Sequence, residues 1–257
     1  MKAINVLDKG YVSLTHTTKS TDDDKIGQET LFELDKLVVE SARTSTGGEL
    51  KGDEKDRKLL HYLIEHEHVS PLEMPTFRFE LKVPLFIVQQ LLRHRWSSFN
   101  QLSARYTENI SEEFHAPDRL RSQDTKNKQG SILGDVDEIT LDEAEFYMSD
   151  VHSHKVSARS YLLTVLRFEK QAYDKLIAAH VAKEQARLVL GPAFYTKLVW
   201  SVNARSLINF LILRLDPHAQ WETQEYARAI CKLFEEEMPW TFDALTKVFP
   251  SVSWKNI

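Results

Sequence analysis

The sequence has one cysteine, eight glycines and no long uncharged apolar run. A lone Cys231 excludes a disulfide framework within the chain and every CxxC zinc or redox motif. Neither GxGxxG nor GxxxxGK[ST] occurs, so a bound nucleotide would need a cradle other than the Rossmann or P-loop type. Charges come too early for a signal peptide, and no segment approaches the roughly 18 apolar residues of a membrane span. We therefore expect a soluble, cytoplasmic protein.

What is present is typical of a folded enzyme-sized chain. Its 257 residues are 42% apolar and 28% charged, and the net charge of −5 argues against nonspecific binding to nucleic acid or to a membrane surface. Few strands and many helices occur without βαβ alternation. This pattern predicts an α+β fold: one catalytic domain over 1–257, with a small mixed or antiparallel sheet packed by several helices.

The apolar periodicity gives the expected elements. Phe77, Phe79, Leu81 and Val83 alternate with polar residues, which predicts a half-buried strand. Pro84 suits the first position of a helix reaching about Trp96, and Asp53 can cap another helix. The remaining expectations are a hairpin from 4–7 and 11–14, a polar surface loop at 16–28, a strand at 194–202, a loop insertion at 112–140, and helical structure at 29–43, 141–180, 181–190, 204–215, 220–239 and 241–249.

A dense polar cluster follows the predicted Pro84 helix, between positions 93 and 106. On that helix Gln90, Arg93 and His94 would share one face, while Arg95 would point to a different side. Guanidinium groups suit phosphate because their rigid fork matches its geometry. A solvated basic helix end explains the same spacing, since cations favour a helix C-terminus.

A second cluster lies in the apolar stretch 203–214. Arg205 and Asn209 would share a helix face, and Arg214 stands in the last turn. Polar groups among Leu, Ile and Phe are costly unless they have partners. An amide and a guanidinium beside apolar walls therefore indicate a ligand pocket.

These clusters carry a resemblance to a known family. Arg93-His94-Arg95, seven residues and then Ser103 resemble the RHRx7S signature of the flavin-dependent thymidylate synthases. The stretches 203–214 (NARSLINFLILR), 216–222 (DPHAQWE), 239–242 (PWTF), 6–10 (VLDKG) and 68–73 (HVSPLE) are also similar to that family. The likeness covers most of the chain except about 16–28 and 112–155.

The resemblance implies an activity and a set of partners. It implies a homotetramer that converts dUMP to dTMP with FAD, taking the carbon from methylenetetrahydrofolate while NADPH reduces the flavin. Arg214 would be the catalytic residue, since its charge on the uracil ring favours the ionised form. The other roles are FAD binding by Ser70, Arg93, His94, Arg95, Gln101, Asn203, Arg205, Asn209 and His218, and dUMP binding, shared between subunits, by Gln90, Arg93, Gln101, Ser103, Arg105, Arg187 and Arg214.

Position 101 departs from the family pattern. The family often has Glu where this chain has Gln101, which keeps the size and hydrogen-bonding capacity but loses the charge. A contact with flavin and nucleotide remains plausible there, whereas a proton-transfer role does not.

Other reactive residues have simpler explanations. Ser103 is ringed by arginines rather than by a base, so it suits phosphate binding better than nucleophilic attack. Cys231 lies beside Ile230 and Phe234 and is expected in the core. No metal is expected, because His61, His66, His68, His152 and His154 fall in no recognisable ligand set, and only the His68 segment matches a family region near flavin.

Two alternative functions remain open. One is another flavin- or folate-linked uracil methyltransferase on the same scaffold, for example one acting on uracil in RNA. The other is a nucleic-acid-binding module with Arg93, Arg95 and Arg105 on phosphates, which the negative net charge disfavours.

Overall fold

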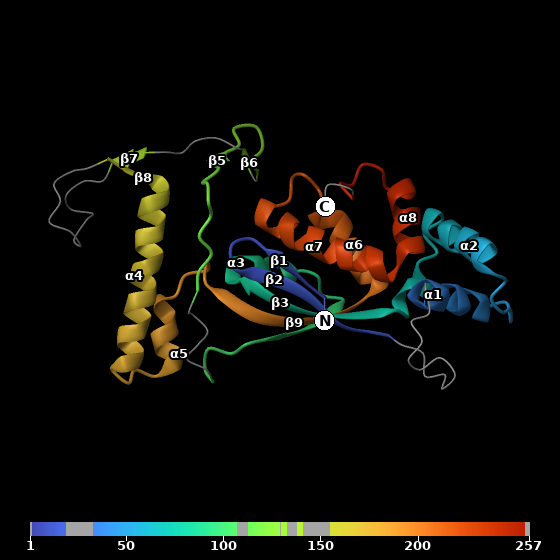
Figure 1. Cartoon of the computed structure of the whole chain (residues 1–257), viewed down its shortest axis with the longest axis horizontal. Helices are drawn as coiled ribbons and strands as arrows, with labels where there is room; N and C mark the ends of the chain where they lie inside the picture. The colour runs from blue at the N-terminus through green and yellow to red at the C-terminus, as the bar shows by residue number, and fades with distance from the viewer. Residues whose placement is uncertain are drawn as a thin grey trace.

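The computed structural model describes residues 2–18, 33–106, 113–128, 130–132, 138–140 and 155–254. Its centre is a five-stranded sheet in the order β1-β2-β3-β9-β4, and every neighbouring pair is antiparallel (Figure 1). The strands are β1 (Lys2–Val6), β2 (Gly10–Thr17), β3 (Thr76–Pro84), β4 (Ser97–Gln101) and β9 (Tyr195–Asn203).

Side-chain alternation explains the central pair of strands. In β3, Phe77, Phe79 and Leu81 are buried while the residues between them face outward. The register runs unbroken from Thr76 opposite Asn203 to Pro84 opposite Tyr195. The predicted strands at 77–83 and 194–202 and the N-terminal hairpin are therefore confirmed.

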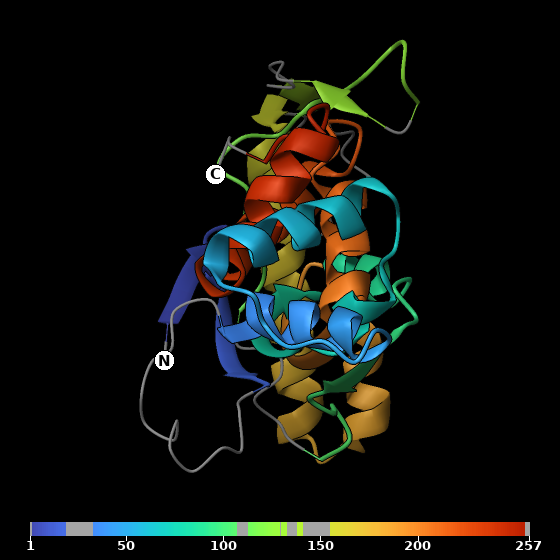
Figure 2. The same ribbon diagram turned by 90° about the vertical axis from the view of Figure 1, so that its right-hand side faces the viewer.

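Helices cover one face of this sheet. Figure 1 shows α6 and α7 lying along the sheet, with α1, α2 and α8 at one end, and Figure 2 shows that end toward the viewer. The rings of Trp200 and Phe210 lie 5.0 Å apart, and those of Phe77 and Phe234 lie 5.7 Å apart, which joins sheet and helices into one core. The helices are α1 (Glu33–Thr44), α2 (Asp53–Glu65), α3 (Leu85–Leu91), α4 (Ala158–Ala178), α5 (Lys183–Ala186), α6 (Ala204–Arg214), α7 (Trp221–Glu237) and α8 (Pro239–Val248).

The helix α4 stands away from this body, beside α5, at the opposite end of the sheet from α1 (Figure 1). Short 3₁₀ turns occur at Ser70–Glu73 and Arg187–Val189. Two small hairpin-like pairs complete the described structure: β5 (Ser122–Gln123) with β6 (Ser131–Ile132), and β7 (Glu138–Thr140) with β8 (Lys155–Ser157).

Several predicted boundaries were wrong. The α3 helix ends at Leu91 rather than near Trp96, and Pro84 precedes it as the N-cap. The sequence 97–101 forms β4, which was missed because its one apolar residue, Phe99, gives no alternating pattern; the Phe99 ring stacks on Trp200 at 5.7 Å.

Three further predictions need correction. Gly52, with a φ of 94°, is the N-cap of α2, and Asp53 is the first helical residue without a side-chain cap bond. The helix predicted at 141–180 is confirmed for the part that forms α4. Residues 155–157 form a strand instead, and 141–154 lie outside the described residues. The polar loop predicted at 16–28 begins as the end of β2 and otherwise also lies outside them. In the part of the chain that is described, no helix is long and apolar enough to cross a membrane.

Candidate active site

Arg214 is the centre of the first group of predicted site residues. It ends α6, and its Nε donates to His94 Nε2 at 3.1 Å while its Nη2 donates to the Gln90 carbonyl at 3.5 Å. The chain turns after α3 so that the amides of Arg93 and His94 bond back to Gln90 and Leu91. The structure therefore brings Gln90, Arg93, His94 and Arg214 together, as the resemblance implied, but through a turn and not along one helix face.

The electrostatics of this group follow from burial. Burial, and then the positive charge of Arg214, lower the pKa of His94 to about 4. At neutral pH His94 is therefore an uncharged acceptor for the Arg214 N–H. Burial, followed by repulsion from Arg93, also lowers the pKa of Arg214, although a guanidinium stays charged. The result is a half-buried positive charge held in one orientation.

Gln90 has a side-chain partner that the sequence analysis did not single out. Its amide donates to Gln220, and Gln220 in turn donates to Glu222 at 2.9 Å. The signal for Gln220 was present in the sequence, because it lies in the DPHAQWE stretch. This contact joins the start of α7 to the Arg214 group.

A second group gathers at the other end of α6. Asn203 is the N-cap of α6, and its Oδ1 accepts from the Ser206 amide at 2.9 Å. Arg205 forms an ion pair with Glu73, which closes the 3₁₀ turn that begins at Ser70. The Ala204 amide also donates to the Pro75 carbonyl, at 2.9 Å. Ser70, Asn203 and Arg205 thus lie in one neighbourhood, and Glu73 is the partner that sequence reasoning missed.

Four further predicted residues lie on the surface. Asn209 is exposed one turn beyond Arg205 on α6. Arg95 is exposed in the turn before β4, and Gln101 is exposed at the end of that strand. His218 is exposed too, and its Nδ1 lies 2.9 Å from Asp216 Oδ1.

Ser103, Arg105 and Arg187 form a third region, beyond the end of β4. Ser103 Oγ accepts from the Arg105 amide at 3.3 Å, and the Arg105 side chain pairs with Glu184 of α5 at 3.4 Å. Arg187 follows α5 and is exposed. In the described part of the chain these residues make no hydrogen bond or ion pair with the Arg214 group. One chain therefore does not join the phosphate-binding candidates to Arg214.

The two candidate nucleophiles are poorly placed for attack. Cys231 is fully buried in α7, which confirms its expected core position, and burial followed by Glu235 raises its thiol pKa to about 12. Ser103 has no described hydrogen bond to a His, Asp or Glu side chain. Neither side chain meets the requirement of an activated nucleophile.

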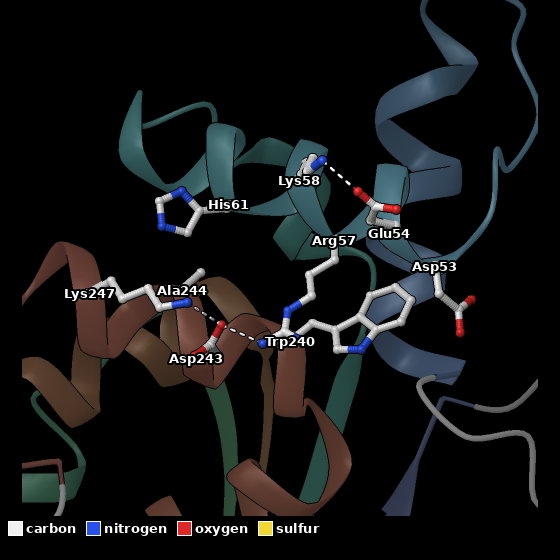
Figure 3. Close-up of a pocket in the computed structure, with 9 residues that line it drawn as sticks. All are labelled: Asp53, Glu54, Arg57, Lys58, His61, Trp240, Asp243, Ala244 and Lys247. Atoms are coloured by element: carbon white, nitrogen blue, oxygen red, sulfur yellow. Dashed lines mark hydrogen bonds and ion pairs between the residues drawn. The ribbon is translucent and has the colours of Figure 1, made fainter.

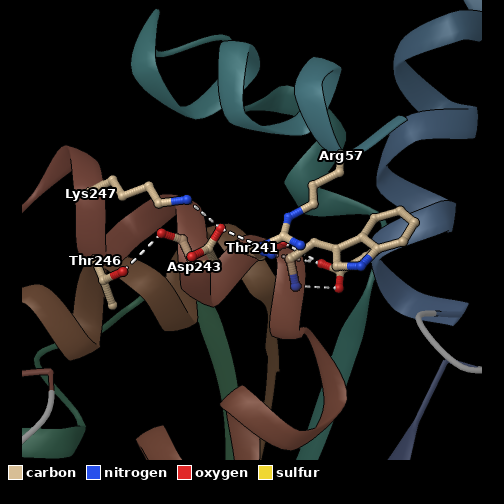
Figure 4. Close-up of polar contacts among 7 residues, drawn as sticks. Arg57, Thr241, Asp243, Thr246 and Lys247 are labelled. Carbon is tan, nitrogen blue, oxygen red and sulfur yellow. Dashed lines mark hydrogen bonds and ion pairs between the residues drawn. The ribbon is translucent and has the colours of Figure 1, made fainter. Parts of the chain in front are cut away.

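A cavity of about 570 Å³ opens between α2 and α8, and none of the site residues described above lines it (Figure 3). Arg57 and Lys247 both contact Asp243 there, at 2.6 and 2.7 Å, and Lys58 contacts Glu54 at 2.7 Å. Figure 4 shows how Asp243 joins the two cations across the helices. Its lining residues are Asp53, Glu54, Arg57, Lys58, His61, Trp240, Asp243, Ala244 and Lys247.

Comparison with known proteins places the chain in a family. Residues 29–240 match the family model described as thymidylate synthase complementing protein. The chain belongs to this family of flavin-dependent thymidylate synthases. A relative of that name from Thermosipho melanesiensis is 41% identical over 94% of this chain and 93% of its own length. The relative from Kosmotoga olearia is 38% identical over 94% and 92%, respectively.

Solved structures agree with the family assignment. The UMP/dUMP methylase PolB from Streptomyces cacaoi, bound with 5-Br UMP, superposes with a TM-score of 0.71 at 28% identity, covering 95% of this chain and 97% of that one. The same protein bound with 5-Br dUMP gives a TM-score of 0.71, covering 97% and 100%. The predicted α+β fold is therefore confirmed, and the chain is a flavin-dependent methyltransferase.

Proposed function

We propose that this chain, as one catalytic domain, methylates dUMP to dTMP, with FAD as its cofactor and methylenetetrahydrofolate and NADPH as co-substrates. The observation that carries the proposal is the Arg214 guanidinium, half-buried and fixed by His94 and the Gln90 carbonyl. A positive charge held in this way stabilises negative charge that develops on a uracil ring. This lets C5 act as the nucleophile without a covalent bond to the enzyme, which agrees with the burial of Cys231.

The side chains suit an anionic dinucleotide. FAD carries a pyrophosphate. Exposed Arg93 and Arg95 flank His94, which contacts Arg214 at the end of α6, and exposed Arg205 and Asn209 lie about one turn apart on the same helix. Guanidinium forks and a neutral amide are the donors that phosphate and flavin carbonyls accept. Ser70, His94, Gln101, Asn203 and His218 complete the proposed FAD set. When bound and reduced by NADPH, FAD would supply the hydride that completes the methyl group.

The nucleotide would be held at two places. Gln90, Arg93 and Arg214 would contact it from one subunit, and Gln101, Ser103 and Arg105 from another, with Arg187 also in reach. Two features support a shared site in a homotetramer. Arg105 contacts Glu184 rather than Arg214 within its own chain. Trp96, Tyr106 and Leu188, close to these residues in sequence, are 87%, 82% and 79% exposed, which is unusual for large apolar side chains.

A titration followed in the flavin spectrum tests the proposal. Purified protein should bind FAD and turn yellow, and dUMP should then perturb the flavin absorbance saturably. Reduction by NADPH, followed by methylenetetrahydrofolate, should yield dTMP. A colourless protein that ignores added FAD would refute the proposed function.

A second substrate deserves the same titration because the similar solved structures are UMP/dUMP methylases. UMP differs from dUMP only by the 2′-hydroxyl. If UMP perturbs the flavin spectrum and is methylated as efficiently as dUMP, the chain is a broader uracil nucleotide methylase. Uracil within an RNA oligonucleotide completes the comparison, and we expect no turnover of it.

A further inference from the structure

A cluster outside the proposed contacts joins three distant parts of the chain around Asp8. Asp8 lies in the turn between β1 and β2, and its side chain is 20% exposed. Its Oδ1 accepts from His115 Nδ1 at 2.6 Å and from the Tyr195 hydroxyl at 2.7 Å, and its Oδ2 accepts from the Ala116 amide at 3.1 Å. We call Asp8, His115 and Tyr195 the Asp8 cluster.

Two members of the Asp8 cluster are buried, and the third, Asp8, is charged. The side chain of His115 is 8% exposed and Tyr195 is 3% exposed. Burial raises the pKa of Asp8, but the bonds from His115, Tyr195 and the Ala116 amide outweigh it and lower the pKa to about 2. Asp8 therefore stays a carboxylate at neutral pH, and its hydrogen bonds are the strong, charge-assisted kind.

The position of the cluster along β9 links it to the nucleotide. The Leu102 amide donates to the Lys197 carbonyl at 2.9 Å, and the Tyr195 amide donates to the Glu113 carbonyl at 3.0 Å. Lys197 and Tyr195 are two residues apart, or about 7 Å along a strand. Leu102 and Glu113 are therefore bonded to neighbouring points of β9.

Ser103 and Arg105 follow immediately after the first of these two attachments. The second attachment is the one that the Asp8 cluster holds: the His115 amide donates to the Ala193 carbonyl at 2.9 Å, and Lys82 forms an ion pair with Glu113. Tyr195 and Lys197 lie on the same strand, so the bonds that hold Tyr195 to Asp8 and to Glu113 also fix the part of β9 to which Leu102 is bonded. A turn that is already ordered loses less conformational entropy when its ligand binds, which favours binding at Ser103 and Arg105.

We propose that Asp8, His115 and Tyr195 are positioning residues that pre-organise the phosphate-binding turn at 103–106. In this role they contact neither flavin nor nucleotide and act through β9, to which Leu102 is bonded. The inference rests on the proposed function, because it takes Ser103 and Arg105 as the contacts of the dUMP phosphate.

Variants of His115 and Asp8 test this role in the full-length, FAD-loaded protein. His115→Leu removes the donor to Asp8, and Asp8→Asn removes the charge. Each should raise the dissociation constant of dUMP about tenfold, which corresponds to about 1.4 kcal/mol. FAD affinity and the single-turnover rate at saturating dUMP should stay within about twofold of wild type, because Arg214 and the flavin contacts are untouched.

Deoxyuridine separates positioning from general damage, because it lacks the phosphate. Its weaker binding should be unchanged in both variants, whereas a distorted fold would weaken it together with dUMP. His115→Asn should restore dUMP affinity, since the Asn amide can donate to Asp8 from nearly the position of His Nδ1. Tyr226→Phe is the matched control: it removes a buried hydroxyl that donates to the Lys82 carbonyl at 2.6 Å, and it should leave dUMP binding unchanged.

The outcomes are distinguishable. Folded His115→Leu and Asp8→Asn proteins that bind dUMP like wild type would overturn the inference, as would equal losses for dUMP and deoxyuridine. If both variants fail to fold, the Asp8 cluster is a folding element and the positioning role is also refuted. A wild-type protein that does not bind dUMP would instead refute the proposed function.

Discussion

Arg105 and Arg214 are both arginines assigned to dUMP, yet the structure predicts opposite kinetic effects for their loss. Arg105 is assigned to the phosphate, which is the same in the ground state and the transition state. Its removal should weaken binding and leave the chemical step nearly unchanged. Arg214 is assigned to the ring, where negative charge develops during the reaction. Its removal should slow the chemistry even at saturating dUMP.

The magnitude for Arg105 follows from its exposure. Its side chain is 59% exposed and pairs with Glu184, which is 56% exposed, so the ion pair that dUMP would displace is worth only about 0.2–1 kcal/mol. A hydrogen bond to a charged group contributes about 1.5–3 kcal/mol. The difference leaves about 0.5–2.8 kcal/mol, so Arg105→Ala should raise the dUMP dissociation constant roughly 2- to 110-fold.

The magnitude for Arg214 follows from its fixed geometry. Its guanidinium is half-buried, with Nε committed to His94 and Nη2 directed at the Gln90 carbonyl. A preorganised donor of this kind costs about 10²- to 10³-fold in rate when it is removed. Arg214→Ala should therefore lower the saturated rate by that factor, whatever happens to its affinity for dUMP.

Two measurements decide between these roles. Flavin absorbance titrations give the dissociation constant, and single-turnover oxidation of reduced flavin with folate present gives the rate at saturating dUMP. Arg57→Ala is a suitable control, since Arg57 is a partly exposed arginine paired with Asp243 in the α2–α8 cleft. A rate defect in Arg105→Ala with normal binding, together with a pure binding defect in Arg214→Ala, would show that the two roles are exchanged.

Three further predictions concern single residues. Cys231→Ala should cost about 1 kcal/mol of unfolding free energy by urea denaturation but retain turnover at a permissive temperature; a folded, flavin-loaded and inactive variant would revive a thiol mechanism. Gln101→Glu, which restores the common family residue, should remain active in the dTMP assay, and an inactive but well-folded variant would mean that the pocket is built around a neutral group. Burial raises the pKa of Asp35 from 3.8 to about 6 despite hydrogen bonds from Thr241 and the Trp240 amide, so its contribution to stability is full below about pH 4 and is lost as the pH rises through 6. Urea unfolding between pH 4 and 7 should therefore show wild type declining relative to Asp35→Asn, and parallel pH profiles would contradict this assignment.

Elements with strong periodicity were predictable from the sequence, and weakly patterned ones were not. The β3 strand and the α6 helix carry clear alternating or apolar patterns, and both were confirmed within about one or two residues. The short β4 strand has only Phe99 as an apolar residue, and its pairing with β9 comes from a partner about a hundred residues away. A local pattern cannot predict a pairing over that distance, so the sequence predicted a helix up to about Trp96 and no strand after it.

The proposed site was predictable in its residues but not in their connections. Family motifs selected Gln90, His94 and Arg214, and the structure places them in contact. No pattern in the sequence predicted the ion pair between Arg205 and Glu73, or the hydrogen bonds of Asp8 with His115 and Tyr195. These contacts join segments about 100 to 190 residues apart, so they depend on the completed sheet and not on local spacing.

The three basic residues of the Arg93-His94-Arg95 motif have different roles in the structure. If the helix continued through the motif, Arg93 and Arg95 would point to different sides of it. The helix ends at Leu91 instead, and both arginines are exposed while His94 turns inward, edge-on to Phe210 at 4.9 Å. Burial beside Arg214 keeps His94 uncharged at neutral pH, because its pKa is about 4. Among the described residues neither arginine side chain has a hydrogen-bond or ion-pair partner, so both are available to anionic ligands, and the histidine between them fixes the guanidinium to which we assign the chemistry.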